Sequence, residues 1–526
     1  MTDNIAIYNN STLLLRMKTI TRISFFIILF TYVSSLQAQN TFTNPVIWSD
    51  VPDMDAVRVG NDYWMVSTTM HFSPGAPIMH SKDLVHWETV NYIFDTLTDS
   101  PKNNLEGGNV YGRGQWAASL KYHKGKFYCF FGTGGRSFLY STTDPRKKWD
   151  IIWQSDTYYH DAAFFIDDDD RPFLFFNASH IQLREFYPDF RPGFKEDGVN
   201  CEVVHGEPKG LLEGSHVYKH DGKYYLTCIW WPRGGIRTQV CFRADKIDGD
   251  YANNMKVILS DDAGMRGRGV AQGYFIDTPN GEWWSMMFQD HDAVGRIPYL
   301  MPLRWNDGWP MLGDENGKIA KVQRIPGGGK KCKERISASD EFKKSNLDIV
   351  WEWNHNPDNS LWSLTERKGF LRLKTGKVVS SIFEARNTLT QRTYGPKSEA
   401  SIRIDISQMK EGDHAGLSTY CSQPGTIEVV VENGERYLLM TDRTAEKARI
   451  AFNMDIIYLR AEADFTTDNA IFSYSEDGKE WKQLGDSFHM VFNLEHFVGN
   501  RFAIFNYATK QSGGWVDVDW FHFAKQ

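Results

Sequence analysis

The sequence of 526 residues lacks a surplus of positive charge, a long apolar run and any clear helical periodicity. Lys and Arg number 59 against 66 Asp and Glu, for a formal net charge of −7, whereas nucleic-acid-binding domains usually carry a basic surface. The apolar run over residues 23–33 is too short to cross a bilayer. We therefore expect no nucleic-acid partner and no membrane span.

Cysteine is also scarce and is not arranged for metal binding. The six Cys residues form no CxxC pair and no zinc-ligand spacing. Cys129 and Cys228 lie inside apolar, strand-like runs, where a buried free thiol is the usual interpretation.

The N-terminal segment has the pattern of an export signal. Lys18 and Arg22 precede the apolar run, and small and polar residues follow it up to Ala38. We expect residues 1–38 to be a signal peptide, with Met17 as an alternative start, and the mature protein to be periplasmic or secreted. No Cys lies near the expected cleavage site, so a lipid anchor is not supported.

The chain is rich in aromatic residues, and pairs of them recur after similar polar turns. A polar turn followed by paired aromatics occurs five times, as in "GNDYWMVST" at Gly60. The first aromatics of the five repeats lie 46 to 64 residues apart, at Tyr63, Phe127, Phe173, Tyr224 and Trp283. This spacing is typical of four-stranded propeller blades. The sequence therefore predicts an all-β fold, with a five-bladed β-propeller over residues 40–325.

Each repeat carries a polar or aromatic residue ten to twelve positions before its first aromatic. These residues are Asp53, Trp116, Asp161, Glu213 and Gln272. Propeller blades are related by rotation about an axis, so equivalent positions on their inner strands converge there. Three of the five are carboxylates, and bringing like charges together is unfavourable. We therefore interpret the convergence as a functional pocket rather than as three solvated loops.

A Gly- and Lys-rich stretch follows the fifth repeat and is expected to be a linker over residues 326–338. Beyond it, residues 339–526 contain seven or more short alternating segments separated by turns, which favours a β-sandwich. The sandwich is expected to act either as a carbohydrate-binding module or as a scaffold packed on the propeller.

Paired carboxylates at a sugar-sized pocket are the equipment of glycoside hydrolysis. With these residues in view, the chain resembles glycoside hydrolase family 43, whose members are five-bladed propellers with an inverting mechanism. The resemblance rests on "VPDMDAVRVGNDYW", "QWAASLKYHKGKFY", "HDAAFFIDDDDRPFL", "EGSHVYKHDGKYYL" and "AVGRIPYLMPLRWNDGWP". It extends to a C-terminal concanavalin-like sandwich and covers nearly the whole mature chain.

The resemblance implies a role for each matching residue. Asp53 would be the general base, Glu213 the general acid, and Asp161 the acid that raises the pKa of the general acid. Three further residues would contact substrate, namely Trp116 beside the terminal sugar, Arg296 at the sugar and the acid cluster, and Phe72 in the wall of the first subsite. Asp55 is expected to point away and to cap the strand or pair with Arg58.

The chain departs from the family where many members carry a His that helps to hold a central cation or water. Gln272 stands there, so we expect no metal in the propeller, and His291 is a candidate to fill the space; both are also expected to contact substrate. No cofactor is expected for catalysis. A structural calcium is expected in the sandwich at Asp340, Glu366 and Asp519, the alternative being three ordinary surface acids.

Together these features predict an exo-acting inverting glycosidase that acts on oligosaccharides. The expected product is terminal L-arabinofuranose, released from side chains derived from hemicellulose such as arabinoxylan or xyloglucan. Two alternatives are a β-D-xylosidase acting on xylo-oligosaccharides and a propeller that binds glycans without cleaving them. The three retained acids argue against the last alternative, because a lectin needs neither a base nor an acid.

Overall fold

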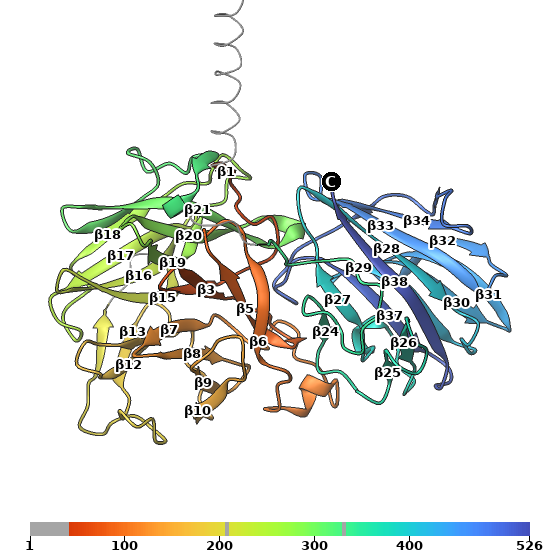
Figure 1. The fold of residues 1–526 in the computed structure, drawn as a ribbon, viewed down its shortest axis with the longest axis horizontal. Coiled ribbons are helices and arrows are strands. Elements are labelled where there is room, and N and C mark those ends of the chain that lie inside the picture. Colours follow the sequence, from red (N-terminus) through yellow and green to blue (C-terminus); the bar gives the residue numbers. More distant parts are fainter. Residues whose placement is uncertain (1–40, 206–209, 329–332) are drawn as a thin grey trace, which may run out of the picture.

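The computed structural model describes residues 41–205, 210–328 and 333–526 (Figure 1). The expected signal peptide, Cys332 and part of the expected linker lie outside these residues. The described residues form strands and four short 3-10 helices, with no α-helix among them, and the 3-10 helices are η1 (Pro101–Asn104), η2 (Asp292–Val294), η3 (Pro326–Gly328) and η4 (Ile382–Glu384). No helix in the described part of the chain has the length and apolar character needed to cross a membrane.

Five four-stranded antiparallel sheets follow one another along the chain and confirm the predicted propeller. Blade one contains β2 (Asp55–Val59), β3 (Asp62–Val66), β5 (Gly75–Ser81) and β6 (Glu88–Phe94). Blade two contains β7 (Ser119–His123), β8 (Lys126–Gly132), β9 (Ser137–Thr142) and β10 (Asp150–Ser155). Blade three contains β11 (Ala163–Ile166), β12 (Pro172–Phe176), β13 (Ile181–Glu185) and β14 (Asn200–Val204). Blade four contains β15 (Gly210–His220), β16 (Lys223–Pro232), β17 (Thr238–Ala244) and β18 (Met255–Leu259). Blade five contains β19 (Ala271–Asp277), β20 (Trp283–Asp290), β21 (Arg296–Asn306) and β22 (Trp309–Leu312).

The first strand of each blade lies innermost. The strands β2, β7, β11, β15 and β19 contact one another in that order, and β19 contacts β2, so the five strands close a ring. The ends of the propeller are joined by β1 (Thr41–Thr43), which pairs with β23 (Val322–Arg324). The side chain of Asn44 adds two hydrogen bonds to the backbone of Leu300 in blade five, at 2.8 and 2.9 Å.

The five repeated aromatics occupy equivalent places, at or near the start of the second strand of each blade. Tyr63, Phe127, Phe173 and Tyr224 are buried, whereas Trp283 is half-buried. Each follows the tight turn between the first two strands, which is why the sequence repeats a polar pair before an aromatic pair. The spacing of the turns was therefore a correct signal for the blades.

The C-terminal unit is a sandwich of two antiparallel sheets (Figure 1). One sheet has the order β32 (Ala445–Ala451), β31 (Glu435–Asp442), β30 (Gly425–Glu432), β29 (Asp413–Tyr420), β37 (Arg501–Ala508), β27 (Leu389–Arg392), β24 (Glu352–Asn354) and β4 (Phe72–Ser73). The other has the order β25 (Trp362–Ser363), β26 (Leu371–Lys374), β38 (Trp515–Lys525), β28 (Lys397–Asp405), β33 (Ile456–Asp464), β34 (Asn469–Ser475) and β35 (Lys482–Gln483), with β36 (Phe488–His489) also paired to β34.

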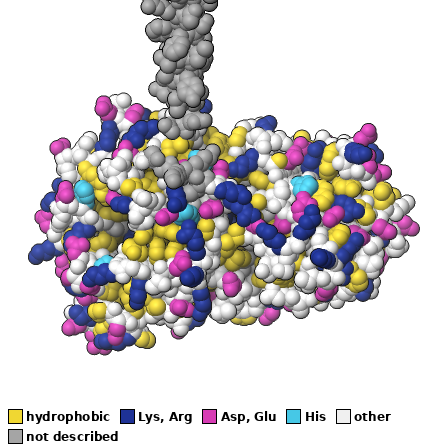
Figure 2. Space-filling model, viewed as in Figure 1, with side chains coloured by type: hydrophobic (Ala, Val, Ile, Leu, Met, Phe, Trp, Pro, Cys, Tyr) yellow, Lys and Arg dark blue, Asp and Glu magenta, His cyan; other side chains and the backbone are white. Residues whose placement is uncertain are grey.

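The two units are joined by backbone pairing as well as by packing. Strand β4 belongs to the propeller segment of the chain, yet it pairs with β24 at the edge of a sandwich sheet. Buried apolar residues of blade five and of the sandwich form one continuous hydrophobic core. On the face shown in Figure 2, basic and acidic side chains are interspersed rather than gathered into a patch of one sign.

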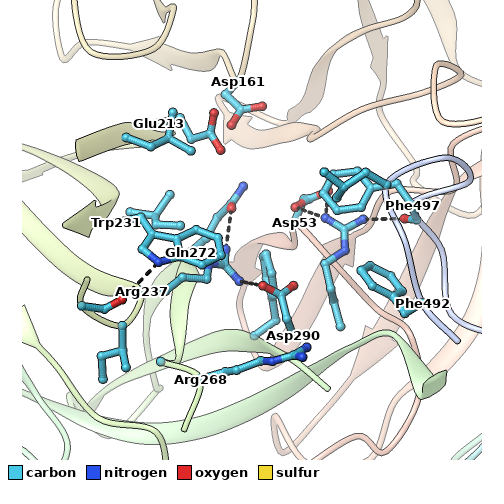
Figure 3. Close-up of a pocket in the computed structure, with 18 of the residues that line it drawn as sticks. Asp53, Asp161, Glu213, Trp231, Arg237, Arg268, Gln272, Asp290, Phe492 and Phe497 are labelled. Carbon is cyan, nitrogen blue, oxygen red and sulfur yellow. Dashed lines mark hydrogen bonds and ion pairs between the residues drawn. The ribbon is translucent and has the colours of Figure 1, made fainter. Parts of the chain in front are cut away.

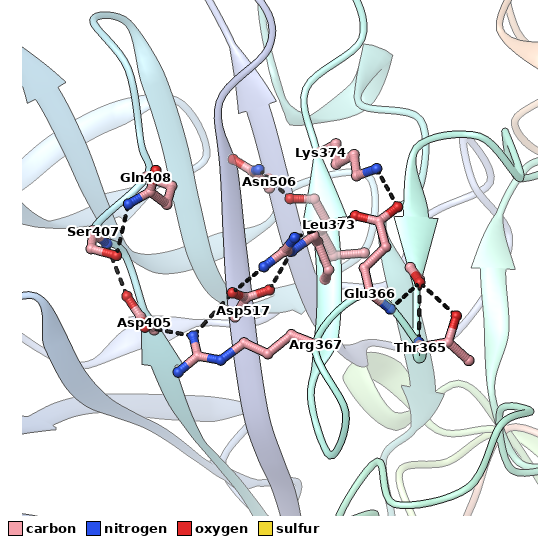
Figure 4. Close-up of polar contacts among 12 residues, drawn as sticks. Thr365, Glu366, Arg367, Leu373, Lys374, Asp405, Ser407, Gln408, Asn506 and Asp517 are labelled. Carbon is pink, nitrogen blue, oxygen red and sulfur yellow. Dashed lines mark hydrogen bonds and ion pairs between the residues drawn. The ribbon is translucent and has the colours of Figure 1, made fainter.

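The expected calcium ligands do not come together in the sandwich. Asp340 accepts a hydrogen bond from Trp351 Nε1 at 2.9 Å, and Asp519 pairs with Arg403 at 2.6 Å. Glu366 is bonded to Lys374 at 2.5 Å and to Arg372 at 3.3 Å (Figure 4). In the described part of the chain these three carboxylates do not form a group of close ligand atoms, and each has its own hydrogen-bond donor, so the calcium site stays a prediction without support from the structure.

Candidate active site

A cavity of about 560 Å³ opens at the propeller axis, at the end where the innermost strands begin (Figure 3). Six of the eight residues proposed for catalysis or substrate binding line it: Asp53, Trp116, Asp161, Glu213, Gln272 and Arg296. They come from all five blades, as the repeat register predicted. The two that do not line it are Phe72 and His291.

The backbone at these positions explains how the side chains reach the axis. Asp53, Asp161 and Gln272 have φ angles of 51°, 42° and 67°, a left-handed conformation that is uncommon outside glycine. Gly214, directly after Glu213, has φ 69°. The pairing register shifts just after Glu213 in β15 and at Gln272 in β19. Such kinks redirect side chains at functional sites, at a cost in backbone strain.

Asp53 is held by one guanidinium group. Arg296 Nη1 donates to both carboxylate oxygens, at 2.9 and 3.1 Å, and both side chains are buried. The other terminal nitrogen, Nη2, donates to the backbone carbonyl of Phe497 at 3.3 Å. The carboxylate is therefore fixed in orientation from the side of blade five and the sandwich.

The carboxylates on the other side of the cavity share an imidazole. His160 Nε2 lies 3.0 Å from Glu213 Oε2 and 3.8 Å from Asp161 Oδ2, and Asp161 also accepts from the Gly214 N–H at 3.1 Å. His160 was not predicted from the sequence. The only feature that could have indicated it is its position directly before Asp161 in "HDAAFF".

Burial and charge shift the protonation of this cluster. Burial raises the pKa of Asp161 to about 7, the charges of Glu213 and Asp53 act in the same direction, and His160 opposes them. Burial lowers the pKa of His160, but the hydrogen bond to Glu213 and the charges of Asp161, Glu213 and Asp53 outweigh it and raise the pKa to about 9. The cluster can therefore retain protons at neutral pH.

The remaining wall near Gln272 is built by an ion pair that sequence reasoning also missed. Arg237 donates to Gln272 Oε1 at 3.3 Å and to Asp290 at 3.2 Å (Figure 3). His291 does not fill this space. Its buried ring lies 5.2 Å from the ring of Trp48 and outside the cavity lining, because β20 ends at Asp290 and the chain turns into η2 at His291.

The sandwich supplies part of the cavity wall. Phe492, Leu494 and Phe497 all line it, and the ring of Phe497 lies 5.3 Å from that of Trp116 and 4.4 Å from the guanidinium of Arg296. Phe72 was expected in this wall but is fully buried in β4, where Arg501 covers its ring at 3.7 Å. That expectation is wrong because β4 is pinned to β24 at the domain interface.

Asp55 lies outside the cavity and caps the start of β2 by accepting a hydrogen bond from the Ala56 N–H at 3.0 Å, as one of the two expectations had it, whereas the expected pair with Arg58 does not form. It is fully buried and accepts hydrogen bonds from Lys121 Nζ at 3.0 Å and from the Leu120 N–H at 2.8 Å. Arg58, at the other end of β2, pairs instead with Asp277 of blade five. The carboxylate therefore joins blades one and two beside the propeller axis.

Among the described residues, one cluster has the spacing of a metal site. The ligand atoms of His160, Asp161 and Glu213 all lie within 4.8 Å of one another. An imidazole and two carboxylates could hold a divalent cation. The contacts of His160 with Glu213 at 3.0 Å and with Asp161 at 3.8 Å already explain why these atoms lie close together.

Comparison with known proteins agrees with this site. The model of glycosyl hydrolases family 43 matches residues 42–310, and the model of the beta-xylosidase C-terminal concanavalin A-like domain matches residues 339–524. A curated relative from Formosa agariphila, named beta-xylosidase, is 30% identical and aligns over 93% of this chain and 91% of its own. A relative from Bacteroides ovatus, named non-reducing end alpha-L-arabinofuranosidase BoGH43B, is 28% identical over 78% of this chain and 80% of its own.

Solved structures give the same result. The fold is similar to that of a bifunctional protein of Bacteroides eggerthii described as GH43-CE, with a TM-score of 0.87 and 43% identity over 93% of this chain. The chain spans 64% of the length of that protein. An engineered family 43 enzyme with endo-xylanase and exo-arabinofuranosidase activity gives a TM-score of 0.84 and 30% identity, over 92% of this chain and all of its own. The chain thus belongs to glycoside hydrolase family 43, with a concanavalin-like C-terminal domain.

Proposed function

We propose that this protein is an exo-acting, inverting glycosidase that releases a terminal pentose from hemicellulose-derived oligosaccharides. The observation that carries the proposal is the placement of two carboxylates from non-adjacent blades around one cavity. Asp53 is held by Arg296, and Glu213 is bonded to His160 (Figure 3). Inverting hydrolysis needs one carboxylate to activate water and another to protonate the leaving oxygen.

The environments of the two carboxylates support a division of roles. Asp53 accepts two hydrogen bonds from Arg296 and can take a proton from a water on the inner side of the sugar. Glu213 lines the cavity and is hydrogen-bonded to His160 at 3.0 Å, which places it to donate a proton to the departing oxygen. Asp161, once ionised, adds a negative charge that favours the protonated form of a neighbouring acid, and Trp116 and Arg296 line the space for the sugar.

Exo action is supported by the shape of the cavity. The loop that carries Phe492, Leu494 and Phe497 reaches from the sandwich and borders the cavity beside Trp116 and Arg296. A pocket bordered in this way favours a chain end over an internal unit of a polymer. The five blades and this loop together surround the acid cluster.

The identity of the pentose is the finer part of the proposal. The expectation from sequence is α-L-arabinofuranose, and the Bacteroides ovatus relative carries that activity in its name. The Formosa agariphila relative is named beta-xylosidase, which makes β-D-xylose the second candidate. The two sugars present similar hydroxyl groups near the scissile bond, so we propose arabinofuranoside as substrate with xyloside as the alternative. Action outside the cytoplasm, on oligosaccharides cut from arabinoxylan or xyloglucan, completes the proposal.

The test is incubation with arabinose-capped and xylose-capped oligosaccharides, with the released sugar and its first-formed anomer identified by proton NMR. We expect a free pentose of inverted configuration from the non-reducing end. Release of a retained anomer would contradict the mechanism, and release of internal fragments would contradict exo action. Binding of the oligosaccharides without any release would favour the glycan-binding alternative.

A further inference from the structure

An apolar ledge lies at the cavity mouth on the same side as Glu213. Strands β15 and β16 pair in regular register here, with Glu213 opposite Ile229 and Leu211 opposite Trp231. Alternate residues of a strand share a face, so Leu211 and Trp231 lie on the same face as Glu213 and two positions further along. All four residues line the cavity.

The two outer residues of this ledge are unusually exposed for their type. Leu211 is 41% exposed and Trp231 is 46% exposed, whereas Leu212, on the opposite face, is fully buried. The indole Nε1 of Trp231 donates to the backbone carbonyl of Gly235 at 3.2 Å, which anchors the ring (Figure 3). Within the described residues, no aromatic or cationic side chain is stacked on this ring, so its surface is available to a ligand.

The chemistry of inversion indicates what would cover that surface. Water attacks from the side of the base, and the leaving oxygen departs on the opposite face of the pentose, toward the acid. The base Asp53 and Trp231 lie on different sides of the cavity in Figure 3, with Trp231 on the same side as Glu213. The sugar ring that carries the leaving oxygen must therefore pass over Glu213 and reach Leu211 and Trp231.

We propose that Trp231, supported by Leu211, is the platform on which the leaving-group sugar stacks. This assignment rests on the proposed function and adds a specificity-determining residue to it. The C–H face of a pyranose packs against an indole, and a large aromatic surface gains much from such burial. The platform lies beyond the pentose pocket, so it selects what the pentose is attached to rather than the pentose itself.

The experiment compares Trp231→Ala and Trp231→Phe with the wild type on xylobiose and on an arabinofuranosyl-xylobiose. The readouts are kcat/KM for each oligosaccharide and the inhibition constants of free xylose and free arabinose, which occupy the pentose pocket alone. We expect Trp231→Ala to lower kcat/KM roughly tenfold, Trp231→Phe to retain most of it, and the inhibition constants to stay unchanged.

Tyr122→Ala is the matched control, because Tyr122 is an aromatic residue 39% exposed on β7 and outside the cavity lining. We expect it to leave every readout at the wild-type value. An unchanged kcat/KM in Trp231→Ala would overturn the platform and leave the proposed function intact. An equal loss of free-pentose inhibition would also overturn it, since Trp231 would then belong to the pentose pocket. A wild type that cleaves neither oligosaccharide would overturn the proposed function and the platform with it.

Discussion

Asp53 and Glu213 are chemically alike, but their neighbours differ. Arg296 fixes Asp53 with two hydrogen bonds donated from one nitrogen, whereas Glu213 is bonded to His160, which also lies 3.8 Å from Asp161. The difference supports the proposed roles, in which Asp53 activates water and Glu213 protonates the leaving oxygen, as in other enzymes where environment separates two acids.

The first prediction tests this division with leaving groups of different quality. A nitrophenolate departs without a proton, but a sugar alkoxide needs one. Asp53→Ala should abolish turnover of aryl and natural glycosides alike. Glu213→Ala should lower kcat/KM on the natural oligosaccharide by about 10²–10⁴ and spare more of the aryl substrate. The reverse pattern would show that base and acid are exchanged.

The second prediction concerns the ionisation of Asp161. Its pKa in the folded protein, about 7, lies above its ordinary value, so its contribution to stability is complete below about pH 4 and is lost as pH rises through 7. Asn cannot ionise. Asp161→Asn should therefore gain in melting temperature relative to the wild type between pH 5 and pH 8, as measured by differential scanning calorimetry.

The same substitution has a kinetic consequence. It removes a negative charge beside the catalytic proton, so the alkaline limb of the kcat/KM profile should move to lower pH. A profile that only drops in height, with both limbs in place, would indicate that Asp161 acts through structure alone. A melting-temperature difference that is the same at both pH values would contradict the assigned ionisation.

At the scale of elements, the loop between β36 and β37 adds a wall from the sandwich to the cavity that the five blades surround. Phe497 contributes its ring to the wall and its carbonyl to Arg296, which in turn holds Asp53. The loop thus joins the sandwich to Asp53, the proposed general base, through hydrogen bonds on both sides of the Arg296 guanidinium.

The third prediction separates the ring of Phe497 from its backbone. Phe497→Ala removes the ring and keeps the carbonyl, so Asp53 should remain oriented while the wall next to Trp116 opens. We expect KM to rise about tenfold with a smaller change in kcat, because the lost contacts are mainly to bound sugar. Met454→Ala, at an exposed apolar position of the sandwich outside the cavity, is the control and should behave as wild type. A fall in kcat with unchanged KM would indicate that the ring positions the base instead.

At the scale of the whole molecule, a buried charge cluster holds the two domains together. Glu352 of β24 is bonded to Arg501 at 2.5 Å, to Arg392 at 3.1 Å and to the hydroxyl of Tyr92 in blade one at 3.0 Å. Arg501 also covers Phe72 of β4. The propeller and the sandwich therefore share a core, a sheet edge and an ion-pair network.

The fourth prediction follows from this cluster. Glu352→Gln leaves two buried guanidinium groups without a counter-charge, which should cost about 3–5 kcal/mol of unfolding free energy. Glu411→Gln breaks an exposed ion pair with Lys510 and should leave the denaturation midpoint almost unchanged. The measurement is urea denaturation followed by fluorescence. Two separate transitions in the wild type would contradict a shared core, and equal midpoints for the two variants would contradict the role of Glu352.

The sequence by itself determined the blades and the residues at or just before the start of their inner strands. Turns and strand alternation are local, so five repeated turns predicted five sheets, and an offset of ten to twelve residues from the first aromatic of each repeat led to Asp53, Asp161 and Glu213. These features can be predicted from the sequence because each blade repeats the same short-range pattern.

Only the tertiary structure decided what surrounds those residues. His160, Arg237 and Asp290 enter the site through contacts between blades, and Phe497 enters it from a domain more than two hundred residues downstream. Phe72 and His291 were placed wrongly in the cavity, Arg58 was named wrongly as a partner for Asp55, and the three sandwich acids are held by separate donors, all for the same reason. Their neighbours are set by β4 joining β24, by blade-to-blade packing and by ion pairs across sheets. These contacts join distant parts of the chain, so they cannot be predicted from a short-range repeat in the sequence.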